Sequence, residues 1–134
     1  MRIVLITEWR DAMNNLKCFI LDDDPLFCSS MVKVGKSLGI QIDAFNSPLE
    51  LERLSKFDYE IGIVDVDLGA VFGPEFEDYL KAIFFNCPIL YVSAMNLRSI
   101  PSKFYLKNFV NKGQGFQKII SAIVNIQKEG VPAG

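Results

Sequence analysis

Residues 61–70 read IGIVDVDLGA, an apolar run that ends in two carboxylates, Asp65 and Asp67. Burying one carboxylate costs free energy, and a second one close by adds repulsion between like charges. The stretch is typical of a buried strand over 61–64 that delivers acidic side chains to one end of a sheet. What those side chains do therefore depends on which other residues the fold brings to the same place.

The rest of the chain alternates strand-like and helix-like segments, which predicts an α/β fold with a parallel sheet and right-handed crossovers. The apolar segments 18–21, 61–64 and 89–92 are expected to be central strands, and the more polar 40–45 and 109–111 to be edges. This pattern fits a flavodoxin-like, doubly wound, five-stranded sheet of order 2-1-3-4-5, whose ligand site lies at the carboxyl ends of the strands.

Four segments show helical signals. Asp24 and Pro25 begin the first, which runs to Gly39, and Ser47-Pro48-Leu49-Glu50 reads as a capping box for a short helix to about Lys56. The other two are expected over 74–85 and 116–127. A further ten-residue stretch, TEWRDAMNNL, could be an extra helix with Thr7 as its N-cap or a disordered leader.

Composition limits the classes of protein that fit. The chain has 134 residues, 50% of them hydrophobic and 22% charged, as expected for one globular domain. Its formal net charge is −2 without a basic block, so neither nucleic acid nor a membrane surface is indicated as a direct partner. No run approaches a membrane span, and MRIVLI is too short for a signal peptide, so a cytoplasmic protein is expected.

The residue types exclude several kinds of chemistry. The chain has no histidine, which removes Ser-His and Cys-His nucleophile pairs and HExxH zinc sites. Cys18, Cys28 and Cys87 have no metal-binding spacing and are expected to be buried free thiols. Carboxylates, hydroxyls and lysines remain to carry whatever chemistry there is.

Such side chains follow the predicted strands. Asp22 and Asp23 follow the first strand, Asp65 and Asp67 close the third, and Ser93 and Lys112 follow the fourth and fifth. If the topology holds, these residues meet in one cleft, where several carboxylates would repel one another unless a hard cation sits among them. Mg²⁺ prefers oxygen ligands and leaves positions for phosphate oxygens. Asp65, last on its strand, is best placed as a nucleophile that forms an acyl phosphate.

The motifs ILDDDP, IVDVDLG, VSA and FVNKG, in this order, resemble the receiver domain of two-component response regulators. The resemblance runs from about Lys17 to Gln127, with residues 1–16 as an extension, 17–128 as the receiver domain and 129–134 as a tail or the start of a linker. It implies that Asp65 is the phosphoacceptor. It also implies a Mg²⁺ site of Asp22, Asp23, Asp65 and the backbone carbonyl of Asp67, and a switch of Ser93, Lys112 and Phe109.

The implied function is Mg²⁺-dependent phosphorylation of Asp65 by a sensor histidine kinase, a phosphotransfer protein or a small phosphodonor. Phosphorylation would then change a surface that binds a downstream effector protein or domain, or a second copy in a homodimer. The only enzymatic activity implied is self-catalysed phosphoryl transfer and autodephosphorylation.

The chain departs from the family in three places. Gly113 stands where a proline usually follows the lysine, which is expected to loosen the aim of Lys112. Only 15 residues separate Ser93 from Phe109, with Pro101 among them, so a shortened or irregular fourth helix is expected. Asp67 and Met95 occupy the variable positions that tune phosphoryl lifetime in the family.

Two alternatives stay open. One is a pseudo-receiver, an interaction module with the fold but no phosphorylation. The other is a phosphatase of the haloacid dehalogenase type, with Asp65 as nucleophile and Asp67 as acid/base. That family places a further acidic group after its lysine, whereas only Glu129 follows Lys112 here.

Overall fold

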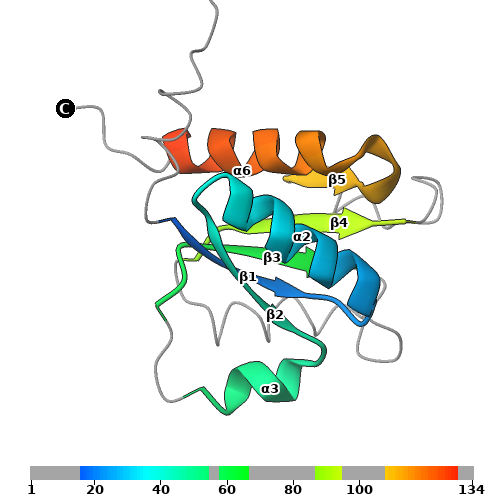
Figure 1. Cartoon of the computed structure of the whole chain (residues 1–134). Coiled ribbons are helices and arrows are strands. Elements are labelled where there is room, and N and C mark those ends of the chain that lie inside the picture. Colours follow the sequence, from blue (N-terminus) through cyan, green and yellow to red (C-terminus); the bar gives the residue numbers. More distant parts are fainter. Residues whose placement is uncertain (1–15, 55–57, 67–86, 95–107, 130–134) are drawn as a thin grey trace, which may run out of the picture.

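A computed structural model describes residues 16–54, 58–66, 87–94 and 108–129 of the chain (Figure 1). Five parallel strands form one sheet of order β2-β1-β3-β4-β5, which confirms the predicted topology. The strands are β1 (Lys17–Leu21), β2 (Gln41–Phe45), β3 (Ile61–Asp65), β4 (Ile89–Ser93) and β5 (Phe109–Asn111). The helices are α2 (Pro25–Ser37), α3 (Pro48–Glu52), the 3₁₀ turn η3 (Lys112–Gln114) and α6 (Phe116–Glu129).

The central and edge strands are those that the apolar pattern predicted. Every residue of β3 is buried, and β1 and β4 are buried apart from their first residues. In each of the edge strands β2 and β5 a single residue is buried, Ile42 and Val110 respectively, and the others are more exposed. Strands in the middle of the sheet, with neighbours on both sides, are therefore more hydrophobic than the strands at its edges.

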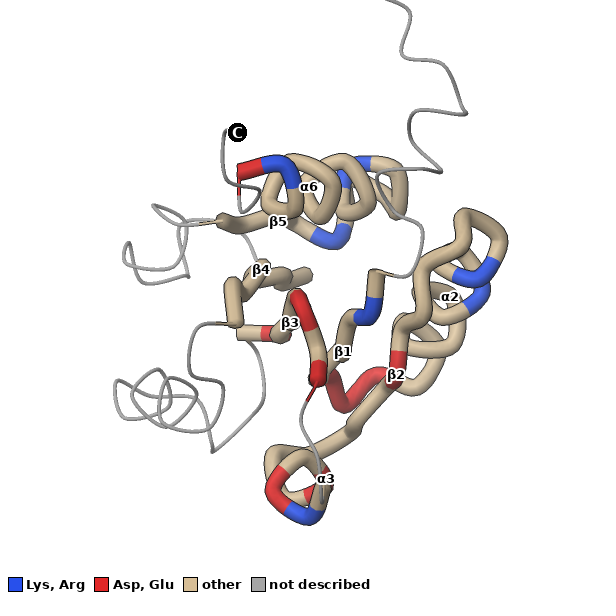
Figure 2. The backbone as a smooth tube through the Cα atoms, turned by 90° about the vertical axis from the view of Figure 1, so that its left-hand side faces the viewer, with Lys and Arg blue, Asp and Glu red and all other residues tan. Residues whose placement is uncertain are grey.

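Side chains alternate across the sheet and form two separate cores. Ile20, Ile63 and Val92 face α2 and α6 in one core, and Leu21, Val64 and Tyr91 face Leu51 of α3 in the other. Figure 2 looks along the strands and shows α2 and α6 on one side of the sheet and α3 on the other. The same alternation assigns each residue at the carboxyl end of a strand to one of these two faces.

Helix α2 begins and ends where its sequence signals predicted. Asp24 is the N-cap, and its Oδ1 accepts hydrogen bonds from the backbone N–H groups of Leu26 (3.0 Å) and Phe27 (3.3 Å). Gly39 follows the helix with a φ of 83°, a conformation that glycine adopts without strain. The start of α2 is thereby fixed directly after the acidic residues that follow β1.

The predicted capping box of α3 is wrong. Ser47 is the N-cap residue, but its side chain makes no capping hydrogen bond. Glu50 reaches one residue further back, where its Oε2 accepts from the N–H of Asn46 at 3.1 Å. The helix also ends at Glu52, with Arg53 as its C-cap, instead of near Lys56. An exposed acidic side chain can satisfy either of two neighbouring donors, and the sequence pattern does not distinguish them.

Several predictions fall outside the described residues: the helix over 74–85, the shortened fourth helix, the extension over residues 1–15 and the tail beyond Glu129. Within the described part of the chain, no helix is long and apolar enough to cross a membrane. Cys18, Cys28 and Cys87 are all free thiols, as predicted; the first two are buried and the third is half-buried.

Candidate functional site

The carboxyl ends of three strands bring two carboxylates and one ammonium together. Asp22 directly follows β1, Asp65 is the last residue of β3, and Lys112 directly follows β5. Asp65 alternates with Val64 and therefore lies on the α2 and α6 side of the sheet, as Ile63 does. Residues far apart in the sequence thus meet at one edge of the same face.

The Lys112 ammonium lies between the two carboxylates. Its Nζ donates a hydrogen bond to Asp65 Oδ2 at 2.9 Å and lies 2.6 Å from Asp22 Oδ2. The side chains of Asp22, Asp65 and Lys112 are 0%, 4% and 13% exposed. Since unpaired buried charges are strongly destabilising, each member of this triad requires the others.

An aromatic ring forms the third contact of the ammonium. Lys112 Nζ lies 4.3 Å from the ring centroid of Phe27, in the first turn of α2. Phe116, the first residue of α6, stacks on Phe27 with a centroid distance of 6.0 Å and an interplanar angle of 22°. A cation over an aromatic face is attracted by the ring quadrupole, so Phe27 contributes to holding Lys112 in place.

The turn that carries Lys112 is built from reciprocal side-chain hydrogen bonds. Asn111 Oδ1 accepts from the N–H of Gly113 at 2.8 Å, and Gln114 Oε1 accepts from the N–H of Asn111 at 3.1 Å. Together these bonds form a capping box around η3. No peptide bond in the described residues is cis. The expected loosening at Gly113 is thus opposed by two hydrogen bonds that the sequence analysis did not predict.

Asp22 is the most constrained carboxylate of the site. Its Oδ1 accepts from the N–H of Asp24 at 2.9 Å, whereas its buried Oδ2 forms the ion pair with Lys112 and accepts no hydrogen bond from the described residues. Burial raises the pKa of Asp22 to about 6, although Lys112 and the Asp24 N–H act in the opposite direction. Burial lowers the pKa of Lys112, but the two carboxylates outweigh this effect and the net shift is upward.

Three carboxylates converge closely enough to share a cation. One oxygen each from Asp22, Asp23 and Asp65 lies within 4.8 Å of the others. Asp23 is exposed, while the buried Oδ2 of Asp22, which is ion-paired with Lys112, has no hydrogen-bond donor in the part of the chain that the structure describes. An all-oxygen set that is partly open to solvent fits Mg²⁺, which binds through few carboxylates and retains water ligands.

The remaining predicted residues are Ser93, Phe109 and Asp67. Ser93 is buried at the end of β4, next to Val92, the register partner of Asp65. It alternates with Val92 and so faces the α3 side of the sheet, where Phe109 also packs. Asp67 is outside the described residues. The structure therefore brings Asp22, Asp23, Asp65 and Lys112 together. Phe109 packs against the core on the α3 side, and strand alternation assigns Ser93 to that side too.

Phe27, Asn111 and Gln114 are the site residues that sequence reasoning missed. Phe27 is an apolar residue of the first predicted helix, and helical spacing does not show which buried ring meets a charge. The spacing of Asn111 and Gln114 matches a capping box, and this pattern in the sequence indicates the turn that carries Lys112.

Comparisons with solved structures give matches to response regulators. A response regulator receiver protein from Burkholderia phymatum matches with a TM-score of 0.71 and 17% identity, over 88% of this chain and 99% of that one. A Burkholderia pseudomallei response regulator with a phosphorylated aspartic acid, calcium ion and citrate gives 0.68 and 17%, over 86% and 70%. Salmonella typhimurium RcsB, studied for its DNA interaction, gives 0.72 and 21%, over 90% and 65%.

No protein-family model and no curated protein sequence matches the chain. At identities near 20%, structural similarity is evidence for the fold alone, and the observed strand order agrees with that fold. The chain has the fold of response-regulator receiver domains.

Proposed function

We propose that this chain is a phosphoacceptor receiver in which Asp65 is phosphorylated and the modification changes a protein-interaction surface. The observation that carries the proposal is the position of Asp65: a buried carboxylate at the end of a central strand, hydrogen-bonded to Lys112 at 2.9 Å and close to Asp22 and Asp23. A nucleophilic carboxylate needs neighbours of this kind, because phosphoryl transfer depends on positioning and charge stabilisation.

The proposed reaction uses Asp65 as the nucleophile. One carboxylate oxygen forms a bond to the phosphorus of a phosphohistidine or small acyl phosphate, while the bond from phosphorus to the donor breaks. The leaving nitrogen or oxygen keeps that electron pair. Lys112, held beside Asp65, supplies a charge-assisted hydrogen bond for a phosphoryl oxygen, and its charge offsets the negative charge that is added.

Asp22, Asp23 and Asp65 would hold Mg²⁺, which supplies positive charge that neutralises the phosphoryl oxygens during transfer. The backbone carbonyl of Asp67 is the further ligand that the family resemblance implies. Asp23 is the exposed member of the set, so it is the carboxylate that an entering cation meets first.

Ser93 and Phe109 are proposed to transmit the change to the other face of the sheet. Ser93 is buried at the end of β4, and Phe109 packs with the core on the α3 side. A hydroxyl that turns toward the new phosphoryl group would leave space there for the aromatic ring. The partners would be a histidine kinase or phosphotransfer protein as donor and an effector as receiver of the signal.

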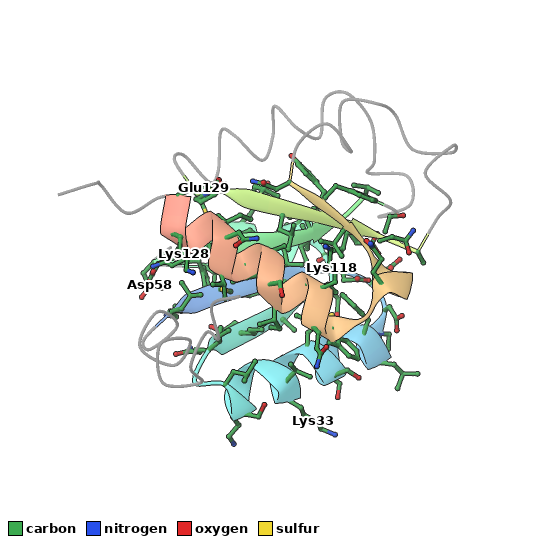
Figure 3. All side chains as sticks on the ribbon, turned by 90° about the horizontal axis from the view of Figure 1, so that it is seen from above. Lys33, Asp58, Lys118, Lys128 and Glu129 are labelled. Carbon is green, nitrogen blue, oxygen red and sulfur yellow. The ribbon has the colours of Figure 1, made fainter. Side chains whose placement is uncertain are left out.

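The test is intact-protein mass spectrometry after incubation with acetyl phosphate and Mg²⁺. We expect a gain of one phosphoryl group that depends on Mg²⁺ and is absent from Asp65→Asn. Asp58→Asn is the matched control, since it makes the same change at an exposed carboxylate that pairs with Lys17 at the amino ends of the strands (Figure 3).

The other outcomes identify the alternatives. Rapid release of phosphate without a lasting adduct would favour the phosphatase. Neither uptake nor release would favour a pseudo-receiver. The acid after the lysine that a phosphatase requires is not supplied by Glu129, because α6 carries it to the end of the helix away from η3 (Figure 3).

A further inference from the structure

We infer that Phe27 is a positioning residue, whose ring holds the Lys112 ammonium in place for phosphoryl transfer to Asp65. The inference rests on the proposed function. Its starting point is the third contact of the Lys112 ammonium. Lys112 Nζ contacts both carboxylates and also lies 4.3 Å from the ring centroid of Phe27, which is not one of the residues at a strand end.

The ring differs from the carboxylates in the kind of attraction that it offers. A carboxylate binds an ammonium through directional hydrogen bonds, whereas an aromatic face attracts a cation over its whole area. When Asp65 carries a phosphoryl group, Lys112 has to exchange an Asp65 oxygen for a phosphoryl oxygen. An aromatic face keeps the ammonium in the site during this exchange without competing for its N–H groups.

The position of the ring is itself fixed by two helices. The N–H of Phe27 donates to the N-cap Asp24 at 3.3 Å, so the first turn of α2 fixes where the side chain begins. Phe27 is 9% exposed, and Phe116 stacks on it from the start of α6. Two helix starts therefore determine where the ring lies, and the ring helps determine where the ammonium lies.

The first experiment compares phosphorylation rates with acetyl phosphate and Mg²⁺. Phe27→Leu keeps apolar bulk but removes the aromatic face, and we expect it to slow phosphoryl uptake about three- to tenfold. Phe27→Tyr keeps the face and is expected to stay within about twofold of the original chain. Phe45→Leu is the matched control, because Phe45 packs on Tyr59 in the other core. Thermal unfolding of each variant verifies that it is folded.

A double-mutant cycle separates positioning from general packing. If Phe27 acts through Lys112, then Phe27→Leu has no further effect on the rate in a Lys112→Met background. An equal slowing with and without Lys112 would overturn the inference, and so would a Phe27→Leu chain that reacts at the original rate.

A nuclear magnetic resonance measurement distinguishes failure of this inference from failure of the proposed function. An aromatic face shifts the CεH₂ protons of Lys112 upfield, and Lys112→Met assigns the signal. We expect the shift in the original chain and Phe27→Tyr and its loss in Phe27→Leu, without any phosphodonor. Absence of the shift would overturn the inference. A chain that shows it but takes up no phosphoryl group would overturn the proposed function and the catalytic purpose of the contact.

Discussion

The turn after β5 depends on a backbone N–H that proline would lack. Gly113 donates this N–H to Asn111 Oδ1 at 2.8 Å. Although receivers usually carry proline after the lysine, we expect Gly113→Pro to lower the free energy of unfolding by about 1 kcal/mol, because the bond is lost and half of the capping box with it. Denaturant unfolding followed by circular dichroism measures the change.

Gly113→Ala is the control for this prediction because it retains the N–H. An added Cβ would lie 3.0 Å from Asn111 Oδ1, a tight contact that costs some stability. Because the hydrogen bond is kept, the loss is expected to be smaller than for proline. Proline stabilises a protein where the local backbone already has the conformation that proline needs. If Gly113→Pro raised the free energy of unfolding, the bond to Asn111 would not be what stabilises this turn.

All three thiols are expected to react slowly because burial disfavours their thiolate forms. Burial raises the pKa of Cys28 and Cys87 to about 11 and that of Cys18 to about 12. Raising the pKa of a thiol lowers its thiolate fraction at a given pH. Alkylation by iodoacetamide at pH 8 should therefore be about a hundredfold slower than for an ordinary thiol at Cys28 and Cys87, and about a thousandfold slower at Cys18. The rate should rise about tenfold per pH unit between pH 7 and 9.

Mass spectrometry of the alkylated chain measures the rates. Cys87 is half-buried and should react before the other two. In urea all three thiols should react at similar rates. Rapid labelling of one thiol under native conditions would contradict the assigned burial.

At the scale of elements, the start of α2 links the acidic residues to the aromatic ring. Asp24 caps the helix through the N–H groups of Leu26 and Phe27. We expect Asp24→Ala to destabilise the chain by about 1 kcal/mol and Asp24→Asn to have little effect, since asparagine caps equally well. Chemical denaturation of the three chains measures this difference. Equal losses for both variants would mean that charge, and not capping, is what Asp24 contributes.

The sequence predicted elements well where one local rule governed them. Apolar runs predicted the strands and their order, and the Asp24–Pro25 pair predicted the start of α2. The capping box at Ser47 was wrong because Glu50 had two donors within reach and bonded the earlier one, Asn46. The cluster of Asp22, Asp65 and Lys112 was predictable because parallel strands end at one edge. The contact of Phe27 with Lys112 was not, because it depends on where two helices place their side chains.

At the scale of the whole molecule, folding assembles acidic residues that repel one another. A cation that binds only the folded chain should stabilise it. At Mg²⁺ concentrations about ten times the dissociation constant, we expect a gain of about 1.4 kcal/mol in the free energy of unfolding. Thermal unfolding at rising Mg²⁺ concentration measures the gain as an increase in Tm.

Two variants make this measurement specific. Asp23→Asn should lose most of the gain, because it removes the exposed ligand of the set. Asp58→Asn should keep the gain, since Asp58 pairs with Lys17 outside the site. Equal stabilisation of all three chains by Mg²⁺ would indicate a general salt effect and would remove the support for a metal site.

The two faces of the sheet also bear on how such a chain can evolve. Asp22, Asp65 and Lys112 contact one another on one side of the sheet. Phe109 packs on the other side, to which alternation along β4 also assigns Ser93. If Asp65 is phosphorylated as proposed, the phosphorylation chemistry and its transmission would draw on separate sets of neighbours. Substitutions that abolish the proposed phosphorylation would then leave the α3 side of the sheet packed, and a descendant that takes up no phosphate could still bind the same partner through that side. A duplicated copy could lose either half alone.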